Sequence, residues 1–234
     1  MLEVGHIDVF YGSFQVLRDV SIQVGDGDLV VLVGSNGHGK STLLKAICGL
    51  AKPKVGTIIY NGTPINPLPC HKIVEMGLTY IAEDRELFSE MSVIENLKLG
   101  AFTNNARRQY KENVELVFQL FPKLSLLANR SALTLSGGEA RMLAIGRGLM
   151  SSAKFLAIDE PSLGLAPNLR SEVYSTIQKI HERGISILLV EQSLPQVLEM
   201  ATRVFLMEEG QIVFEGNREQ ARKEERLSGA YLVS

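Results

Sequence analysis

The sequence predicts an α/β fold with a parallel sheet, within a single domain of 234 residues. Strand-like apolar runs alternate with helical stretches along the chain, which is the order typical of a parallel sheet flanked by helices. Two further patterns modify this prediction. Apolar and polar residues alternate over 1–28, which indicates antiparallel strands, and a helical stretch over 92–150 interrupts the alternation. We therefore expect an α/β core with an N-terminal antiparallel β subdomain and an inserted α-helical subdomain.

The first predicted elements surround a glycine-rich turn. Segments 2–12 and 20–28 alternate apolar and polar residues and end in turn residues, so they predict an antiparallel ribbon. The apolar run 29–34 predicts a buried central strand, and 40–50 predicts a helix that begins at the turn. Segment 56–62 predicts a strand that ends in an Asn-Gly turn.

Helices dominate the middle of the chain. A strand within 76–88 breaks into a charged loop, after which Ser92 and Glu95 have the spacing of a capping box. We expect helix from there to about residue 121, and again over 137–150.

The last third of the chain returns to the alternating order. The expected elements are strands at 154–162, 185–192, 203–210 and 211–216 and helices at 168–184 and 218–227. The predicted single domain, 1–234, therefore divides into a core with its β subdomain (1–88 and 151–234) and a helical subdomain (89–150).

Composition and charge limit the classes of function. A formal net charge of -2 argues against a nucleic-acid partner, because binding to phosphate backbones normally requires a surplus of basic residues. The N-terminus lacks the basic-then-apolar order of a signal peptide, and the longest apolar runs are too short to span a bilayer. Any membrane association should therefore depend on a protein partner. The 2 cysteines and 4 histidines, without metal-ligand spacing, predict neither a disulfide nor a zinc or iron site.

The glycine-rich turn after the run 29–34 has the pattern of a phosphate loop. Its glycines let backbone N–H groups turn toward an anion, and the following helix adds the positive end of its dipole. Lys40 is expected to reach the β- and γ-phosphates, and Ser41 to ligate Mg²⁺. The alternative is a chance glycine-rich turn, and His38 is expected to be a surface residue rather than a catalytic one. The predicted nucleotide-binding residues of this turn are Gly34, Ser35, Asn36, Gly37, His38, Gly39, Lys40, Ser41 and Thr42.

Two acidic residues follow the apolar run 155–158. Asp159 is expected beside Mg²⁺, through a water, and Glu160 is expected one step further, where it can polarise the water that attacks the γ-phosphate. A solvated acid pair is the alternative interpretation. Together with the phosphate loop, the pair resembles the motifs of a P-loop NTPase, which implies a RecA-like core. The chain has no Asn-Lys-x-Asp motif that would select guanine.

The segment "LSGGE", 135–139, lies about twenty residues before the Asp-Glu strand. Phosphate loop, signature and acid pair in this order resemble the ATP-binding-cassette (ABC) ATPases over the whole chain, and the helical subdomain would carry the signature. The resemblance implies that two cassettes pair head to tail, each signature gripping the γ-phosphate held by the other subunit. The residues that would bind ATP in trans are Leu135, Ser136, Gly137, Gly138 and Glu139. Tyr11 matches the aromatic that stacks on adenine, and the alternative for Tyr11 is a core aromatic of a strand.

Three positions depart from the common pattern of the family. Glu83 stands where most cassettes have Gln, Gln192 where they have His, and Leu165 where they have Asp. These departures resemble one subgroup, the second ATPase of importers for branched-chain and other hydrophobic amino acids. Ala140 and Arg141 follow "LSGGE", where that subgroup usually has two Gln.

Glu83 and Gln192 change the charge of the expected site. At about 6 Å and an effective dielectric near 20, each unit-charge pair contributes roughly 3 kcal/mol, so attraction of Glu83 to Mg²⁺ and its repulsion from phosphate have comparable size. Gln192 can donate a hydrogen bond to the γ-phosphate but cannot become a cation. We expect Glu160, Gln192 and Glu83 to be catalytic, and Ser41, Asp159 and Glu83 to hold Mg²⁺. The alternative for Glu83 and Gln192 is a solvated loop position.

The resemblance also implies an assembly. It predicts an ATPase, using ATP and Mg²⁺, that pairs with a second ABC ATPase subunit as a heterodimer or homodimer on the cytoplasmic face of the membrane. Two transmembrane permease subunits would bind the pair, an extracytoplasmic solute-binding protein would deliver the solute, and no nucleic acid would be bound.

Three alternative functions are weighed against this one. A urea or small polar-solute importer would have a closely similar ATPase. Cassettes that act on DNA or ribosomes carry a coiled-coil insertion or a second cassette, and this sequence has neither. In a small-molecule kinase, "LSGGE" would have no role.

Overall fold

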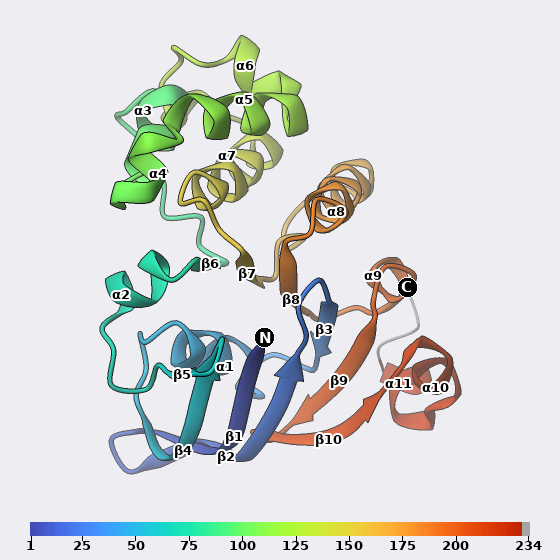
Figure 1. The fold of residues 1–234 in the computed structure, drawn as a ribbon. Coiled ribbons are helices and arrows are strands. Elements are labelled where there is room, and N and C mark those ends of the chain that lie inside the picture. Colours follow the sequence, from blue (N-terminus) through green and yellow to red (C-terminus); the bar gives the residue numbers. More distant parts are fainter. Residues whose placement is uncertain (231–234) are drawn as a thin grey trace.

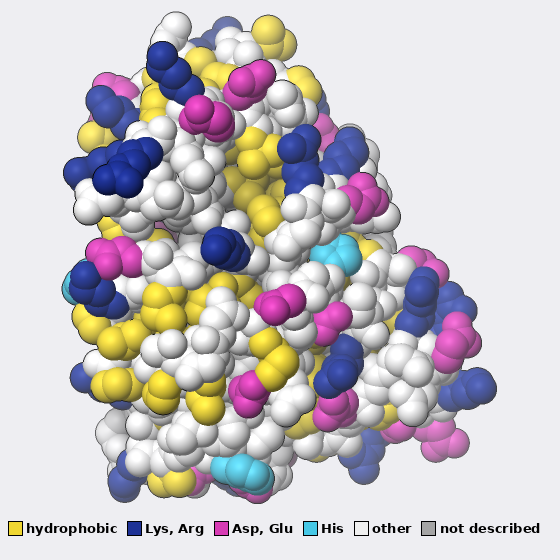
Figure 2. Space-filling view, in the orientation of Figure 1, with side chains coloured by type: hydrophobic (Ala, Val, Ile, Leu, Met, Phe, Trp, Pro, Cys, Tyr) yellow, Lys and Arg dark blue, Asp and Glu magenta, His cyan; other side chains and the backbone are white. Residues whose placement is uncertain are grey.

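The computed structural model describes residues 1–230, so the last four residues of the predicted domain lie outside the described part of the chain. Figure 1 shows a group of helices at the top of the view, a large sheet through the middle and an antiparallel sheet at the bottom. Figure 2 shows Lys and Arg side chains interspersed with Asp and Glu over the visible face, as the nearly balanced net charge of -2 implies.

A six-stranded sheet forms the centre of the fold. In spatial order its strands are β10 (Gln211–Gly216), β9 (Arg203–Glu208), β3 (Leu29–Val33), β8 (Ser186–Glu191), β7 (Phe155–Asp159) and β6 (Leu78–Ile81). Strands β9, β3, β8, β7 and β6 pair in parallel, and β10 joins β9 as an antiparallel edge strand. Strands β3, β7 and β8 are buried throughout, which explains their nearly continuous apolar sequences. Because these strands are parallel, the loops at their carboxyl ends meet at one edge.

A four-stranded antiparallel sheet contains the N-terminus, as predicted. Its order is β2 (Phe14–Val24), β1 (Leu2–Tyr11), β4 (Pro53–Tyr60) and β5 (Thr63–Pro64). Helix α1 (Lys40–Ile47) contributes Leu43, Leu44 and Ile47 to a core cluster that also contains residues of both sheets. The predicted fold class, an α/β core with an antiparallel β portion, is confirmed.

The remaining helices cover the large sheet and extend beyond it. They are α2 (Cys70–Glu75), α3 (Val93–Gly100), α4 (Asn104–Arg108), α5 (Tyr110–Leu120), α6 (Pro122–Leu126), α7 (Gly137–Leu149), α8 (Pro167–His181), α9 (Pro195–Leu198), α10 (Arg218–Lys223) and α11 (Glu225–Ala230). A second core cluster joins the sheet residues Leu156 and Leu189 to Leu97 of α3 and Leu143 of α7. No helix among residues 1–230 has both the length and the apolarity that a membrane span requires.

The structure divides one predicted helical stretch and corrects one helix prediction. The helical stretch expected to about residue 121 is present as separate helices, because Gly100 ends α3 and Thr103 caps a new helix, α4, by accepting a hydrogen bond from the N–H of Ala106 at 3.2 Å. The single terminal helix expected over 218–227 is wrong, because Glu224 is extended (ψ 117°) between α10 and α11. The boundaries 89–150 for the helical subdomain stay a proposal.

Candidate functional site

The turn between β3 and α1 encloses part of a cavity of about 300 Å³. Gly37 and Gly39 have φ angles of 81° and 99°, in the left-handed region that favours glycine. A Cβ at Gly34 would lie 2.4 Å from the carbonyl oxygen of Met207, so the turn can approach β9 this closely only with glycine. The cavity is lined by Val16, Asn36, Gly37, Gly39, Lys40, Ser41, Thr42, Glu83 and Glu160. Backbone amides at a helix N-terminus with a lysine suit a phosphate group.

Lys40 is 4% exposed and has three oxygen partners. Its Nζ donates to the carbonyl oxygens of Gly34 at 2.8 Å and Ser35 at 3.1 Å. It also lies 3.1 Å from Oε1 of Glu160, so a carboxylate balances the buried ammonium charge. The ion pair places the cation at the cavity, where a phosphate could take over from the carboxylate as its partner.

Asp159 is fully buried at the carboxyl end of β7. Its Oδ1 accepts from the Ser41 hydroxyl at 3.1 Å, and its Oδ2 accepts from the Tyr80 hydroxyl at 2.8 Å. Burial raises the pKa of Asp159, while the hydrogen bonds from Tyr80 and Ser41 oppose that shift. The structure thus brings together two of the three residues expected at Mg²⁺, Ser41 and Asp159, and the Tyr80 hydroxyl orients the Asp159 carboxylate.

Glu160 adopts an unusual backbone conformation. Its φ is 41°, which costs a non-glycine residue about 1–3 kcal/mol and is typical of residues fixed at functional sites. Its N–H donates to the carbonyl oxygen of Val190 on β8 at 3.0 Å. Gln192, which follows β8, donates from Nε2 to Oε2 of Glu160. Two residues 32 positions apart in sequence are therefore in contact, and one of them, Glu160, lines the cavity.

Glu83 is half-buried and lines the same cavity from the loop after β6. Burial raises the pKa of Glu83, and the nearby charges of Glu160 and Asp159 raise it further. The predicted catalytic and metal residues are thus together in space. Their clustered negative charge favours a cation in the cavity.

The signature residues lie elsewhere. Ser136 and Gly137 are exposed at the start of α7, and among residues 1–230 none of 135–139 lines the phosphate-loop cavity. The Ser136 N–H donates to the Glu139 carboxylate at 2.8 Å, and the Ser136 hydroxyl accepts from the Glu139 N–H at 3.4 Å, a capping box. These hydrogen bonds lower the pKa of Glu139. A solvent-facing helix N-terminus can bind a phosphate presented from outside the chain.

Gly138, Leu135 and three other predicted positions are placed as follows. Gly138 is buried, with Leu169 of α8 3.0 Å from where its Cβ would be, and Leu135 packs partly buried on the second core cluster. Tyr11, the last residue of β1, is 52% exposed, which excludes the alternative of a core aromatic. His38 is half-buried in the phosphate turn, and Leu165 packs in the core.

Sequence reasoning missed a third buried carboxylate, which lies beside the site next to Asp159 and Glu160. Glu191 is 3% exposed and accepts from the Tyr174 hydroxyl at 2.8 Å. It also accepts from the N–H and hydroxyl of Ser162 at 3.3 and 3.2 Å, so it fastens the loop after Glu160 to the strand that leads to Gln192. Burial raises the pKa of Glu191. The signal in the sequence was an acid at the end of the otherwise apolar run "SILLVE".

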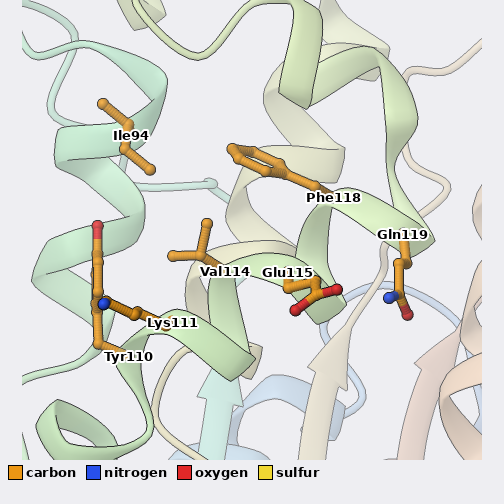
Figure 3. Close-up of a pocket in the computed structure, with 7 residues that line it drawn as sticks. All are labelled: Ile94, Tyr110, Lys111, Val114, Glu115, Phe118 and Gln119. Carbon is orange, nitrogen blue, oxygen red and sulfur yellow. The ribbon is translucent and has the colours of Figure 1, made fainter.

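Another cavity lies in the helical part of the chain. It measures about 460 Å³ and is lined between α3 and α5 by Ile94, Tyr110, Lys111, Val114, Glu115, Phe118 and Gln119. Figure 3 shows the side chains of Ile94, Val114 and Phe118 directed toward this space. None of the predicted nucleotide, metal or catalytic residues contributes to it, so the phosphate-loop cavity is the candidate site.

Comparison with known proteins gives one consistent family. A family model described as ABC transporter matches residues 17–163. The chain is 39% identical over 232 residues to the high-affinity branched-chain amino acid transport ATP-binding protein BraG of Pseudomonas aeruginosa, covering 99% of both chains. It is 34% identical to the probable branched-chain amino acid transport ATP-binding protein LivF of Archaeoglobus fulgidus, covering 97% of this chain and 96% of that one. The crystal structure of a nucleotide-free ATP-binding cassette from an ABC transporter superposes with a TM-score of 0.86 at 29% identity, and the match covers 100% of this chain and 99% of that one.

Proposed function

The chain belongs to the ABC transporter family and is therefore an ATP-binding ATPase, and we propose that it powers an importer of branched-chain or other hydrophobic amino acids. The observation that carries the proposal is the full-length similarity to the Pseudomonas transport protein. The departures at Glu83 and Gln192, which resemble the same subgroup of ATPases, support it. Urea and other small polar solutes stay the alternative cargo.

In the proposed reaction, ATP binds with its phosphates on the turn 34–42. Lys40 contacts the β- and γ-phosphates, and the amides of the turn bind their oxygens. Glu160 accepts a hydrogen bond from the water that attacks the γ-phosphate and orients it in line with the breaking bond. Gln192 holds Glu160 in place through its side-chain amide, and Tyr11 stacks on the adenine.

The donor set near the phosphate loop fits Mg²⁺. A hydroxyl, Ser41, and a carboxylate, Asp159, lie 3.1 Å apart, and both are oxygen donors of the kind that Mg²⁺ prefers. Among residues 1–230 no group of three or more His, Cys, Asp or Glu is placed to hold a metal, which agrees with a cation shared with substrate phosphates. When bound, Mg²⁺ would neutralise charge on the β- and γ-phosphates, and Glu83 would add a third oxygen donor.

We further propose that the chain works as one half of an ATPase pair. The exposed signature would complete the nucleotide site of the second ATPase subunit, of the same or a different sequence. A groove of about 530 Å³ beside the Glu83 loop would receive a permease subunit at the cytoplasmic face of the membrane. Its exposed apolar residues, among them Leu50, Phe88 and Phe102, favour an apolar helix as the occupant.

Transport by the assembled complex tests the proposal. In proteoliposomes that contain the chain with its permease and second ATPase, we expect ATP-dependent uptake of radiolabelled leucine that unlabelled isoleucine or valine inhibits. The variant Arg108→Gln should transport normally, because Arg108 is exposed and lines neither the phosphate-loop cavity nor the groove beside the Glu83 loop. Uptake of urea in place of leucine would support the alternative cargo, and ATP hydrolysis without any solute uptake would contradict the importer.

The amide at position 192 predicts a particular pH profile. Because Gln does not titrate near neutrality, turnover of the natural chain should show no inflection from this position. Gln192→His should add an inflection to the pH profile of turnover above about pH 6.5, since the nearby Glu160 carboxylate favours the protonated imidazole. Steady-state kcat measured from pH 5.5 to 9 checks this, with Gln192→Asn as the non-titrating control. Identical profiles for both variants would show that position 192 does not act in the reaction.

A further inference from the structure

The signature helix carries a guanidinium group in the protein interior. Arg141 of α7 is 1% exposed, and its Nη1 donates to the carbonyl oxygen of Ala82 at 3.1 Å, directly before Glu83. Its Nε has no hydrogen-bond partner among residues 1–230. Burial and the charge of Arg85 lower the pKa of Arg141, while the carboxylates of Glu191 and Glu83 oppose that shift. A buried cation that is only partly compensated lowers stability, so its presence here calls for a function.

A second arginine of the same helix holds the other end of the same loop. Arg147 donates to the carbonyl oxygens of Glu86 at 2.7 Å and Arg85 at 3.1 Å. Both loop residues have positive φ, 44° at Glu86 and 61° at Arg85, which is a costly conformation that requires external support. The Arg85 guanidinium in turn lies 3.6 Å from the position of a Cβ on Gly137, so the loop also contacts the signature.

We propose that Arg141 is a positioning residue, which fastens the Glu83 loop to the signature helix so that the two move as one body. The signature serves the nucleotide site of the partner subunit, whereas Glu83 serves the site of its own chain. The connection by Arg141 therefore links the two sites of a dimer through one rigid contact. A glutamine at this position, usual in the subgroup that the chain resembles, could replace one hydrogen bond but not the charge that faces Glu83 and Glu191. The inference rests on the proposed role of Glu83.

Amide hydrogen exchange tests the connection without reference to activity. In the full-length Arg141→Gln variant, we expect exchange at 82–86 to become about ten-fold faster, because the loop loses a charge-assisted hydrogen bond. The turn 34–42 should keep its rate and serves as the internal reference. Arg141→Lys keeps the charge without the planar guanidinium, so its exchange rate at 82–86 should fall between those of the natural chain and of Arg141→Gln. Arg108→Gln is the surface control. Unchanged exchange at 82–86, or equal acceleration throughout the chain, would overturn the proposal.

ATP hydrolysis tests the consequence for the site. We expect Arg141→Gln to lower kcat about ten-fold while KM for ATP changes less than two-fold, because the loop is displaced rather than the phosphate turn. In a Glu83→Gln background, the same change should have little further effect, since both act through one group. Independent, multiplying effects would overturn the positioning role. If Glu83→Gln alone leaves kcat unchanged, the proposed catalytic role of Glu83 is wrong. The hydrogen-exchange result then still decides whether Arg141 connects the Glu83 loop to the signature helix.

Discussion

Glu160→Gln is expected to lower ATP turnover by about 10²–10⁴-fold, the range typical for loss of a group that accepts a proton from an attacking nucleophile. The amide fits the same space and can still accept a hydrogen bond from Gln192, so the fold should persist. It cannot accept a proton from water. Lys40 keeps its two carbonyl partners, and loss of its ion pair with Glu160 leaves the ammonium free to bind phosphate.

Two measurements separate binding from chemistry in this variant. Single-turnover phosphate release should be slowed by the full factor, whereas calorimetric affinity for ATP should be equal to or tighter than that of the natural chain. Glu172→Gln is the matched control, because Glu172 is a half-exposed carboxylate of α8, outside the site, that pairs with Lys123 at 3.0 Å. Turnover above a tenth of the natural rate would exclude Glu160 as the group that activates water.

The central strands and the phosphate turn could be predicted because their causes are local. Strands β3, β7 and β8 are buried on both faces, so their sequences are almost wholly apolar, and the glycines of the turn meet a backbone requirement that other residues cannot meet. The breaks between the helices of the middle region escaped prediction. Gly100 ends α3 and Thr103 caps α4, but a single glycine or threonine also occurs inside helices, so neither marks a helix boundary by itself.

Neighbours across the sheet could not be predicted from the sequence. Tyr80 reaches Asp159 only because β6 lies next to β7, and Arg141 reaches Ala82 only because α7 packs on the loop after β6. A contact between two single residues that are distant in sequence leaves no repeating pattern from which it could be predicted. The signature was identified only through resemblance to a family, because Ser136 and Gly137 are exposed at the start of α7 and, among residues 1–230, none of 135–139 lines the phosphate-loop cavity.

The largest consequence of that exposed signature is that two inactive variants should restore each other. Gly137→Asp places a negative charge at the open end of α7, where its Cβ would meet only the Arg85 side chain at 3.6 and 3.7 Å. The monomer should therefore fold normally, while the charge repels the γ-phosphate held by the partner. We expect turnover to fall at least 100-fold, and equally for Lys40→Ala, which loses the phosphate contact in its own chain. Gly137→Ala, which adds the Cβ without charge, is the control and should lose far less.

Mixing the two variants distinguishes action in trans from action within one chain. In a mixed pair, the turn of the Gly137→Asp chain faces the natural signature of the Lys40→Ala chain, so one nucleotide site is intact and the other is doubly defective. An equal mixture at concentrations that favour pairing should recover up to about a quarter of the natural rate, because half of the pairs are mixed and each contains one working site. If the signature acted on the phosphate turn of its own chain, neither chain would contain a complete site. The mixture would then show no more activity than the two variants measured separately.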